Sequence, residues 1–334
     1  MHIEPSVFKP PWGLSNQHLQ TILSSVGPRR IKLSRIKRQL AKSATEHTLS
    51  LSDDIRLLCY HSVSERAPAK ALVIMIHGWE GSEVSSYMLS AAASLLDEGY
   101  DVVRLNMRDH GNSHHLNEEA FNSTLLVEMV EAVEAIQSQL SYERYHLAGF
   151  SLGGNFCLRV AAAAHDHAIR LSSATAFCPV VHAELANSAL VEPRNWLYNA
   201  YFVRKWKRSL RLKNLHFPET YALEQFARLK SLDDMNRELI PRYTSFTQLS
   251  DYFDAYAIVD DRLRKTVCPC YLHFAKDDMI IPVEGVERIN NHGNLQIVVT
   301  EHGGHCGFLS NWRFDSWQDE RLVQIVSSFE PTKP

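Results

Sequence analysis

The stretch GFSLGG, residues 149–154, is the most informative part of this chain of 334 residues. The apolar run YHLAGF before it predicts a strand that ends at Ser151, and the residues after Ser151 predict a helix. A hydroxyl that stands clear of so sharp a turn leaves no room for side chains two positions before and two positions after it. Glycine at 149 and 153 meets this demand, so the pattern Gly-x-Ser-x-Gly predicts a nucleophile elbow with Ser151 as the nucleophile.

A glycine-rich phosphate-binding turn is the alternative for the same stretch. Such a turn would carry a lysine after the glycines or the spacing Gly-x-Gly-x-x-Gly, and this stretch has neither. We therefore favour the elbow, in which Gly154 lets the helix approach the neighbouring strand. Backbone N–H groups at the start of that helix would lie beside Ser151.

Strand and helix patterns alternate on both sides of the elbow. Strands are predicted over residues 71–76, 101–106, 145–150, 174–178, 270–275 and 295–300, and helices over residues 85–97, 125–140, 152–164 and 317–329. A hairpin over residues 48–62, with Asp53 and Asp54 at its turn, precedes them. This alternation predicts an α/β fold with a mostly parallel central sheet and helices on both faces.

The alternation stops at about His182 and resumes after about Thr266. We predict that residues 182–266 form a helical cap, inserted into a core of residues 1–181 and 267–334. Residues 1–50 are an N-terminal extension of that core. The inserted stretch is rich in aromatic side chains: Trp196, Tyr198, Tyr201, Phe202, Trp206, Phe226, Tyr252, Phe253 and Tyr256. Most of them should pack within the protein, and we expect a few to face a ligand.

Seven basic residues are concentrated near the N-terminus: Arg29, Arg30, Lys32, Arg35, Lys37, Arg38 and Lys42. A patch that contacts a membrane surface is one interpretation of this segment. An extended segment with a solvated face is the other, and we favour it.

A serine hydroxyl needs a base to react at neutral pH, and an elbow serine is followed in the chain by an acid and then a histidine. The stretch AKDDMIIP offers Asp277 and Asp278 directly after a predicted strand. We choose Asp278, because an acid followed by x-apolar-apolar-Pro fits that residue. Because the carboxyl ends of parallel strands meet at one edge, this acid should lie near Ser151.

The histidine should come from EHGGHCGF, which follows the last predicted strand and contains His302 and His305. We choose His305, because the two glycines before it would allow a mobile loop to bring its ring over Ser151.

Two backbone N–H groups are candidates for an oxyanion hole. One belongs to Leu152, the residue after the nucleophile, and the other to Trp79 in the loop His77-Gly78-Trp79-Glu80-Gly81. His77 precedes a glycine, so we expect it to hold this loop by hydrogen bonds and not to act as a base. The turn Arg108 to Ser113 follows a strand at the same edge, and a wall of the site is one interpretation of it. A turn held by its own side-chain hydrogen bonds is the other, and we favour it.

Composition excludes several classes of protein. The net charge of −3 gives no sign of nucleic-acid binding, and no apolar run reaches the roughly 18 residues that span a bilayer. The N-terminus lacks the apolar stretch of a secretory signal, so we expect a cytoplasmic protein. We expect no cofactor and no metal: Cys268-Pro-Cys270 is too tightly spaced for a zinc site, and His114-His115 has no matching ligands.

The chain resembles the α/β-hydrolases, and within them the YheT-like group of predicted hydrolases. That group is similar to mammalian α/β-hydrolase domain proteins that act on phospholipids and esters. The matching stretches are residues 10–23 (PPWGLSNQHLQTIL), 77–82, 149–155, 275–282 and 303–308. The first of these is the most specific, because ordinary α/β-hydrolases lack it. The resemblance implies a triad of Ser151, Asp278 and His305. After Arg108 this chain has Asp109, where relatives usually have glycine.

These features predict a serine hydrolase, of carboxylesterase or lipase type, that cleaves acyl esters through an acyl-enzyme intermediate. The substrate would be a small acyl ester or a lipid-like molecule, with peripheral contact to a membrane as an option. An acyltransferase or a thioesterase with the same triad is the alternative within enzymes. A non-catalytic ligand receptor on a hydrolase fold is the alternative outside them.

Overall fold

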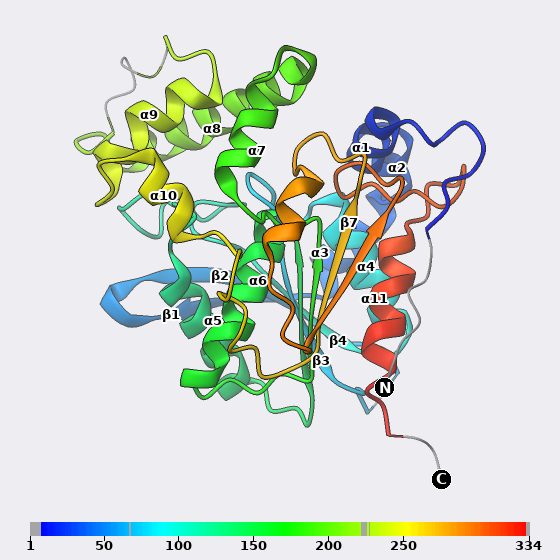
Figure 1. The fold of residues 1–334 in the computed structure, drawn as a ribbon. Coiled ribbons are helices and arrows are strands. Elements are labelled where there is room, and N and C mark those ends of the chain that lie inside the picture. The colour runs from blue at the N-terminus through cyan, green and yellow to red at the C-terminus, as the bar shows by residue number, and fades with distance from the viewer. Residues whose placement is uncertain (1–7, 67, 222–225, 227, 332–334) are drawn as a thin grey trace.

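The computed structural model describes residues 8–66, 68–221, 226 and 228–331 (Figure 1). Its strands form one eight-stranded sheet in the order β1-β2-β4-β3-β5-β6-β7-β8. Their bounds are β1 (Thr45–Ser50), β2 (Arg56–Ser62), β3 (Leu72–Ile76), β4 (Asp101–Leu105), β5 (Tyr145–Phe150), β6 (Ser173–Phe177), β7 (Cys270–Ala275) and β8 (Leu295–Thr300). The pairs β1–β2 and β2–β4 are antiparallel, and the others are parallel. The predicted mostly parallel sheet is therefore confirmed.

The hairpin at the start of the sheet is confirmed as well. Its turn is the short 3-10 helix η1 (Ser52–Asp54), and both Asp53 and Asp54 have positive φ angles, of 54° and 58°. Aspartate tolerates this left-handed region better than most residues, because its short side chain can hydrogen-bond locally.

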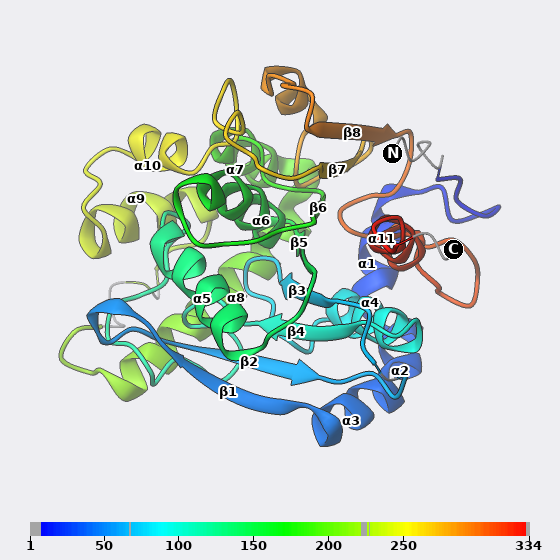
Figure 2. The same ribbon diagram turned by 90° about the horizontal axis from the view of Figure 1, so that it is seen from below.

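Helices cover both faces of the sheet, as the sequence predicts (Figure 2). The α-helices of the core are α4 (Ser86–Asp97), α5 (Leu126–Gln139), α6 (Leu152–Ala163) and α11 (Trp317–Ser327). Side chains alternate along β3: Ile74 belongs to the apolar cluster under α5 and α6, and Val73 belongs to the cluster under α4 and α11. A strand that is apolar on both sides needs a helix layer on each, which explains the continuous apolar run of β3.

In the described residues, four α-helices lie between β6 and β7, and Figure 1 shows them gathered in one group at the upper left. They are α7 (Ala183–Val191), α8 (Trp196–His216), α9 (Leu232–Tyr243) and α10 (Leu249–Ala255), and we call them the inserted helices. The described residues between 182 and 266 hold no strand of the sheet. The described residues also form the short 3-10 helices η2 (Ala164–Asp166), η3 (Pro193–Asn195) and η5 (Val283–Arg288).

The basic N-terminal segment is helical, so the expectation of an extended segment is wrong. Three helices occupy this region: α1 (Gln17–Ser25), α2 (Pro28–Lys32) and α3 (Ser34–Ser43). The reason is the helical spacing of Leu33, Ile36 and Leu40, which places these three side chains on one side of the chain. Leu33 and Leu40 are buried, and Ile36 is partly buried against the core.

Most of the seven basic side chains are exposed, as expected, but Arg29 is an exception. Only 1% of its surface is exposed, and its guanidinium lies 3.6 Å from the carboxylate of Asp319 on α11. A buried cation needs such a partner, so α2 is tied to the body of the protein. Among the described residues, no helix is long and apolar enough to cross a membrane.

Candidate active site

Ser151 stands at the junction of β5 and α6 in a strained backbone conformation, with φ of 54° and ψ of −121°. A Cβ atom at position 149 would lie 2.1 Å from the carbonyl oxygen of Gly153. A Cβ at position 153 would lie 2.3 Å from the carbonyl oxygens of Ile76 and His77. Both approaches are far below van der Waals contact, so only glycine fits on either side of the serine. Such strain is found mainly where the surrounding structure holds a functional side chain in place.

The structure brings Ser151, His305 and Asp278 together. Nε2 of His305 lies 2.9 Å from Oγ of Ser151, and Nδ1 of the same ring lies 2.8 Å from Oδ2 of Asp278. The other carboxylate oxygen of Asp278 accepts hydrogen bonds from the N–H groups of Ile280 and Ile281, at 2.8 and 2.9 Å. The carboxylate is therefore fixed on both sides, with one oxygen left for the imidazole.

The pKa of the His305 imidazole is higher than that of a free histidine, so the ring binds a proton more readily. Burial alone would lower its pKa, but the charges of Asp278 and Cys306 and the hydrogen bond to Asp278 together raise the pKa to about 9. This is the expected effect of a carboxylate placed next to an imidazole in a site with little water.

Asp277 and His302, the two residues we passed over in the sequence, lie together outside this arrangement. Their side chains are 3.4 Å apart, and the other carboxylate oxygen of Asp277 accepts a hydrogen bond of 2.9 Å from the N–H of Gly304. Asp277 therefore supports the loop that carries His305 without touching its ring.

The loop after β3 approaches the serine closely, because a Cβ at Gly78 would lie 3.1 Å from the Cβ of Ser151. The carbonyl of Gly78 lies 2.8 Å from Nδ1 of His77, and Nε2 of His77 accepts a hydrogen bond of 3.2 Å from the N–H of Met107. Burial lowers the pKa of His77 to about 4, so its ring is neutral and suited to both roles. His77 thus holds the loop, as the sequence led us to expect.

The two N–H groups singled out in the sequence, those of Trp79 and Leu152, make no hydrogen bond to the described part of the chain. The Trp79 N–H shares a planar peptide unit with the carbonyl of Gly78, so it points away from His77. Their role as an oxyanion hole stays a prediction.

His110, in the turn from Arg108 to Ser113, contacts the loop after β3, and the sequence did not predict this contact. Its Nε2 accepts a hydrogen bond of 3.0 Å from the N–H of Glu80, a residue with a φ of 56°. Nδ1 of His110 lies 2.7 Å from the carbonyl of Arg108, and Ser113 donates to the carbonyl of His110. Side chains of the turn from Arg108 to Ser113 form hydrogen bonds within the turn, as expected. The turn also supports the loop after β3, which contains Trp79.

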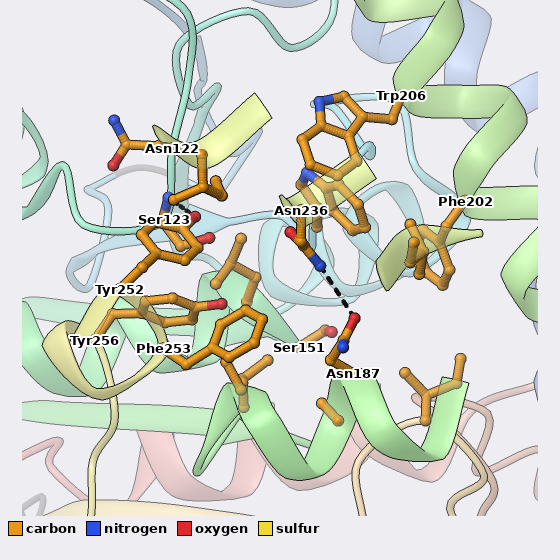
Figure 3. Close-up of a pocket in the computed structure, with 18 of the residues that line it drawn as sticks. Asn122, Ser123, Ser151, Asn187, Phe202, Trp206, Asn236, Tyr252, Phe253 and Tyr256 are labelled. Carbon is orange, nitrogen blue, oxygen red and sulfur yellow. Dashed lines mark hydrogen bonds between the residues drawn. The ribbon is translucent and has the colours of Figure 1, made fainter. Parts of the chain in front are cut away.

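A cavity of about 110 Å³ opens beside Ser151. Aromatic side chains from the inserted helices line it, together with two from the core: Phe202 and Trp206 on α8, Tyr252 and Phe253 on α10, and Trp79 and Phe121 (Figure 3). The ring of Trp79 stacks on Phe202 and meets the edge of Trp206, each at 5.2 Å between centroids. The cavity wall is therefore shared between the core and the inserted helices.

Polar side chains also line the cavity: besides Ser151, they are Asn122, Ser123, Asn187 and Asn236. Nδ2 of Asn236 on α9 donates a hydrogen bond of 3.0 Å to Oδ1 of Asn187 on α7, and both side chains line the cavity (Figure 3). No sequence pattern marked this pair, because the two residues meet only through the packing of separate helices.

Within the described residues, one group of side chains has metal-ligating atoms close together. The atoms belong to Cys178, His305 and Cys306 and lie within 4.8 Å of one another. Since both ring nitrogens of His305 already contact Ser151 and Asp278, a metal ion at this point would take the ring away from one of them.

Comparison with known proteins shows the family of the chain. Residues 71–311 match the family model described as alpha/beta hydrolase fold. The putative esterase YheT of Escherichia coli (strain K12) is 21% identical, over 98% of this chain and 94% of its own length. The phospholipase ABHD3 of Homo sapiens is 22% identical, over 87% of this chain and 72% of its own length.

Among solved structures, an esterase of Pyrococcus furiosus shares the fold with a TM-score of 0.60 and 15% identity. The similarity covers 98% of this chain and 99% of that one. The family match over most of the chain, together with the full-length similarity to YheT, leads to one conclusion: this chain belongs to the α/β-hydrolase family and to its YheT-like group.

Proposed function

We propose that the chain is a serine esterase that cleaves carboxylic acyl esters with Ser151, His305 and Asp278. The observation that carries the proposal is the unbroken line of contacts from the serine hydroxyl through the imidazole to a fixed carboxylate. The similarity to proteins named as an esterase and a phospholipase supports ester bonds as the target.

In the first half of the reaction, Ser151 attacks the carbonyl carbon of the ester while Nε2 of His305 takes the hydroxyl proton. Asp278 holds the ring in the tautomer that leaves Nε2 free, and it stabilises the imidazolium that forms. The N–H groups of Trp79 and Leu152 receive the charge that develops on the carbonyl oxygen. His305 then returns the proton to the leaving alcohol, which leaves an acyl group on Ser151.

In the second half, a water molecule takes the place of the alcohol. His305 removes a proton from the water, which attacks the acyl carbon, and the acid product leaves as Ser151 recovers its proton. The chemistry needs no metal and no organic cofactor.

We further propose that residues 182–266 act as a cap over a core formed by residues 1–181 and 267–334. The aromatic wall that the inserted helices contribute would hold the apolar acyl part of the substrate next to Ser151. A lipid-like ester fits this wall better than a polar one, because nearly all of its large side chains are aromatic or aliphatic.

Labelling with a fluorophosphonate and hydrolysis of p-nitrophenyl esters test the proposal. Wild-type protein should take the label and release nitrophenol, and Ser151→Ala should do neither, with a loss of activity on the order of 10⁴-fold or more. An unlabelled and inactive wild-type chain would instead favour a ligand receptor. Faster turnover of acyl thioesters, or acyl transfer to an added alcohol, would favour a thioesterase or an acyltransferase.

A further inference from the structure

The stretch PPWGLSNQHLQTIL, residues 10–23, is the most distinctive part of the sequence, and the catalytic scheme above gives it no role. In the structure it forms α1 and the residues just before it. The side chain of Asn16 accepts hydrogen bonds from the N–H groups of His18 and Leu19, at 3.0 and 3.1 Å, and so sets the start of this helix.

Thr21 of α1 contacts the backbone of His305 directly. Its Oγ1 accepts a hydrogen bond of 2.9 Å from the N–H of His305, and its own proton goes to the carbonyl of Gln17 at 2.8 Å. Because the hydroxyl proton is engaged within the helix, an oxygen lone pair is directed at His305. The residue that carries the base is thus bonded to a residue 284 positions away.

Gln20 holds the far end of the same loop. It is fully buried, and its Oε1 accepts a hydrogen bond of 2.6 Å from the N–H of Leu309. Its Nε2 donates to the carbonyls of Leu14 and Leu309, at 2.7 and 3.3 Å. A buried carboxamide with both of its ends bonded fixes the position of whatever it contacts.

The glycines of the His305 loop allow α1 to come this close. A Cβ at Gly304 would lie 2.6 Å from Oγ1 of Thr21, and a Cβ at Gly307 would lie 2.7 Å from the carbonyl oxygen of Gln20. From the sequence we attributed the glycines before His305 to loop mobility. The contacts with α1 give a second reason for Gly304, and they account for Gly307.

The same helix also contacts the loop that carries Asp278 and one of the inserted helices, α8. Nε2 of Gln17 lies 3.7 Å from the sulfur of Met279, the residue after Asp278. Nδ1 of His18 lies 2.9 Å from the hydroxyl of Tyr198 on α8, and the two rings stack. Four of the five residues from Gln17 to Thr21 therefore contact the loop that carries His305, the loop that carries Asp278, or α8.

We infer that α1 sets the position of His305, with Thr21 and Gln20 as positioning residues; this inference rests on the proposed function. A helix that only covered apolar surface would present apolar side chains to the core. At the His305 loop, α1 instead presents a hydroxyl and a carboxamide, each bonded to a backbone N–H of that loop. Fixing the backbone of the loop keeps Nε2 of His305 within bonding distance of Ser151.

The test compares Thr21→Val, which keeps the shape but removes the acceptor, with Thr21→Ser, which keeps the acceptor. In the valine variant we expect kcat and the rate of fluorophosphonate labelling to fall roughly 10- to 100-fold, as misplacement of a catalytic group does. KM should change little, because α1 does not line the cavity. The serine variant should stay within a few-fold of wild type.

Hydrogen exchange at the His305 amide gives a readout that needs no turnover. Exchange should be faster in Thr21→Val and unchanged in Thr21→Ser. Thr48→Val, an exposed threonine on β1, is the matched control and should leave every measurement unchanged. If Thr21→Val unfolds at the assay temperature, Thr21→Ala tests the same bond.

Wild-type rates and exchange in Thr21→Val would overturn the inference. Equal losses in the valine and serine variants, with equal falls in Tm, would do so too, because they would mean that α1 only packs. In both cases a labelled wild-type protein keeps the proposed function intact. A wild-type protein that takes no label and cleaves no ester overturns the proposed function, and the inference with it.

Discussion

Asp277 and Asp278 are neighbours in the chain, but their carboxylates contact different histidines. Asp278 lies 2.8 Å from the ring of His305, and Asp277 lies 3.4 Å from the ring of His302. Only the first of these rings reaches Ser151. One residue of displacement along the loop therefore separates a carboxylate that can act in catalysis from one that supports the backbone.

This difference predicts unequal effects of two matched substitutions. Asp278→Asn should lower kcat by on the order of 10⁴-fold, because an amide in this place no longer fixes the required tautomer of His305. Asp277→Asn should change kcat only a few-fold, since the amide oxygen can still accept the hydrogen bond from Gly304. Steady-state hydrolysis of one p-nitrophenyl ester measures both, and a reversed ranking would make Asp277 the catalytic acid.

The raised pKa of His305 predicts an alkaline activity profile. General-base catalysis needs the neutral ring, so kcat/KM should climb as pH rises and level off near the pKa of about 9. Asp278→Asn removes a negative charge that favours the imidazolium, so the remaining activity of this variant should level off at lower pH. Profiles from about pH 6 to about pH 10 with a non-ionising ester measure this. A wild-type profile that is flat over this range would contradict the prediction.

A buried ion pair between the core and α8 predicts a large effect on stability. Nζ of Lys213 lies 3.1 Å from the carboxylate of Asp109, and both side chains are almost fully buried. Lys213→Met leaves Asp109 buried without its cation, which should cost about 3 kcal/mol of unfolding free energy. Urea titration measures this loss, and the double variant Asp109→Asn, Lys213→Met should recover most of it.

The pH dependence of that loss has a definite sign. Burial raises the pKa of Asp109 to about 6, and Lys213 partly offsets this effect. Without Lys213 the folded-state pKa rises further above the unfolded value, so folding binds a proton over a wider pH range. The loss should therefore be larger at about pH 8 than at about pH 5. Lys265→Met, which breaks an exposed pair with Asp166, should leave the free energy of unfolding nearly unchanged at either pH.

The sheet and the elbow could be predicted from the sequence because their signals are local. Strands β5, β7 and β8 have the bounds that their apolar runs predict. The meeting of Ser151 with His305 follows from topology, since parallel strands end at one edge of the sheet. Glycine at 149 and 153 could be explained in advance, because it depends on the turn alone.

Other parts of the site depend on contacts between distant segments, which leave no periodic signal. Thr21 bonds to His305 across 284 positions, and Asn187 bonds to Asn236 across 49. The helix α3 was missed for a different reason. Its charged residues outnumber its apolar ones, so the spacing of Leu33, Ile36 and Leu40 was hidden in a segment that looked only basic.

The aromatic wall predicts a preference for longer acyl chains. Each methylene group that moves from water into an apolar cavity gains about 0.8 kcal/mol, or roughly fourfold in kcat/KM if the contact persists in the transition state. We expect kcat/KM to rise from acetate to about hexanoate or octanoate and then to level off where the cavity ends. Acetate, butyrate, hexanoate and octanoate esters of p-nitrophenol, measured under one condition, give this profile.

Substitution of two tryptophans on α8 tests whether the aromatic wall binds the acyl chain or only packs on itself. Trp206 of α8 lines the cavity, and Trp196 of α8 is 66% exposed. Trp206→Ala removes part of the wall, so it should flatten the rise of kcat/KM with acyl length, whereas Trp196→Ala should leave the slope unchanged. If acetate is the best substrate of the wild-type protein, or if Trp206→Ala keeps the full slope, the aromatic side chains are structural and the acyl pocket is small.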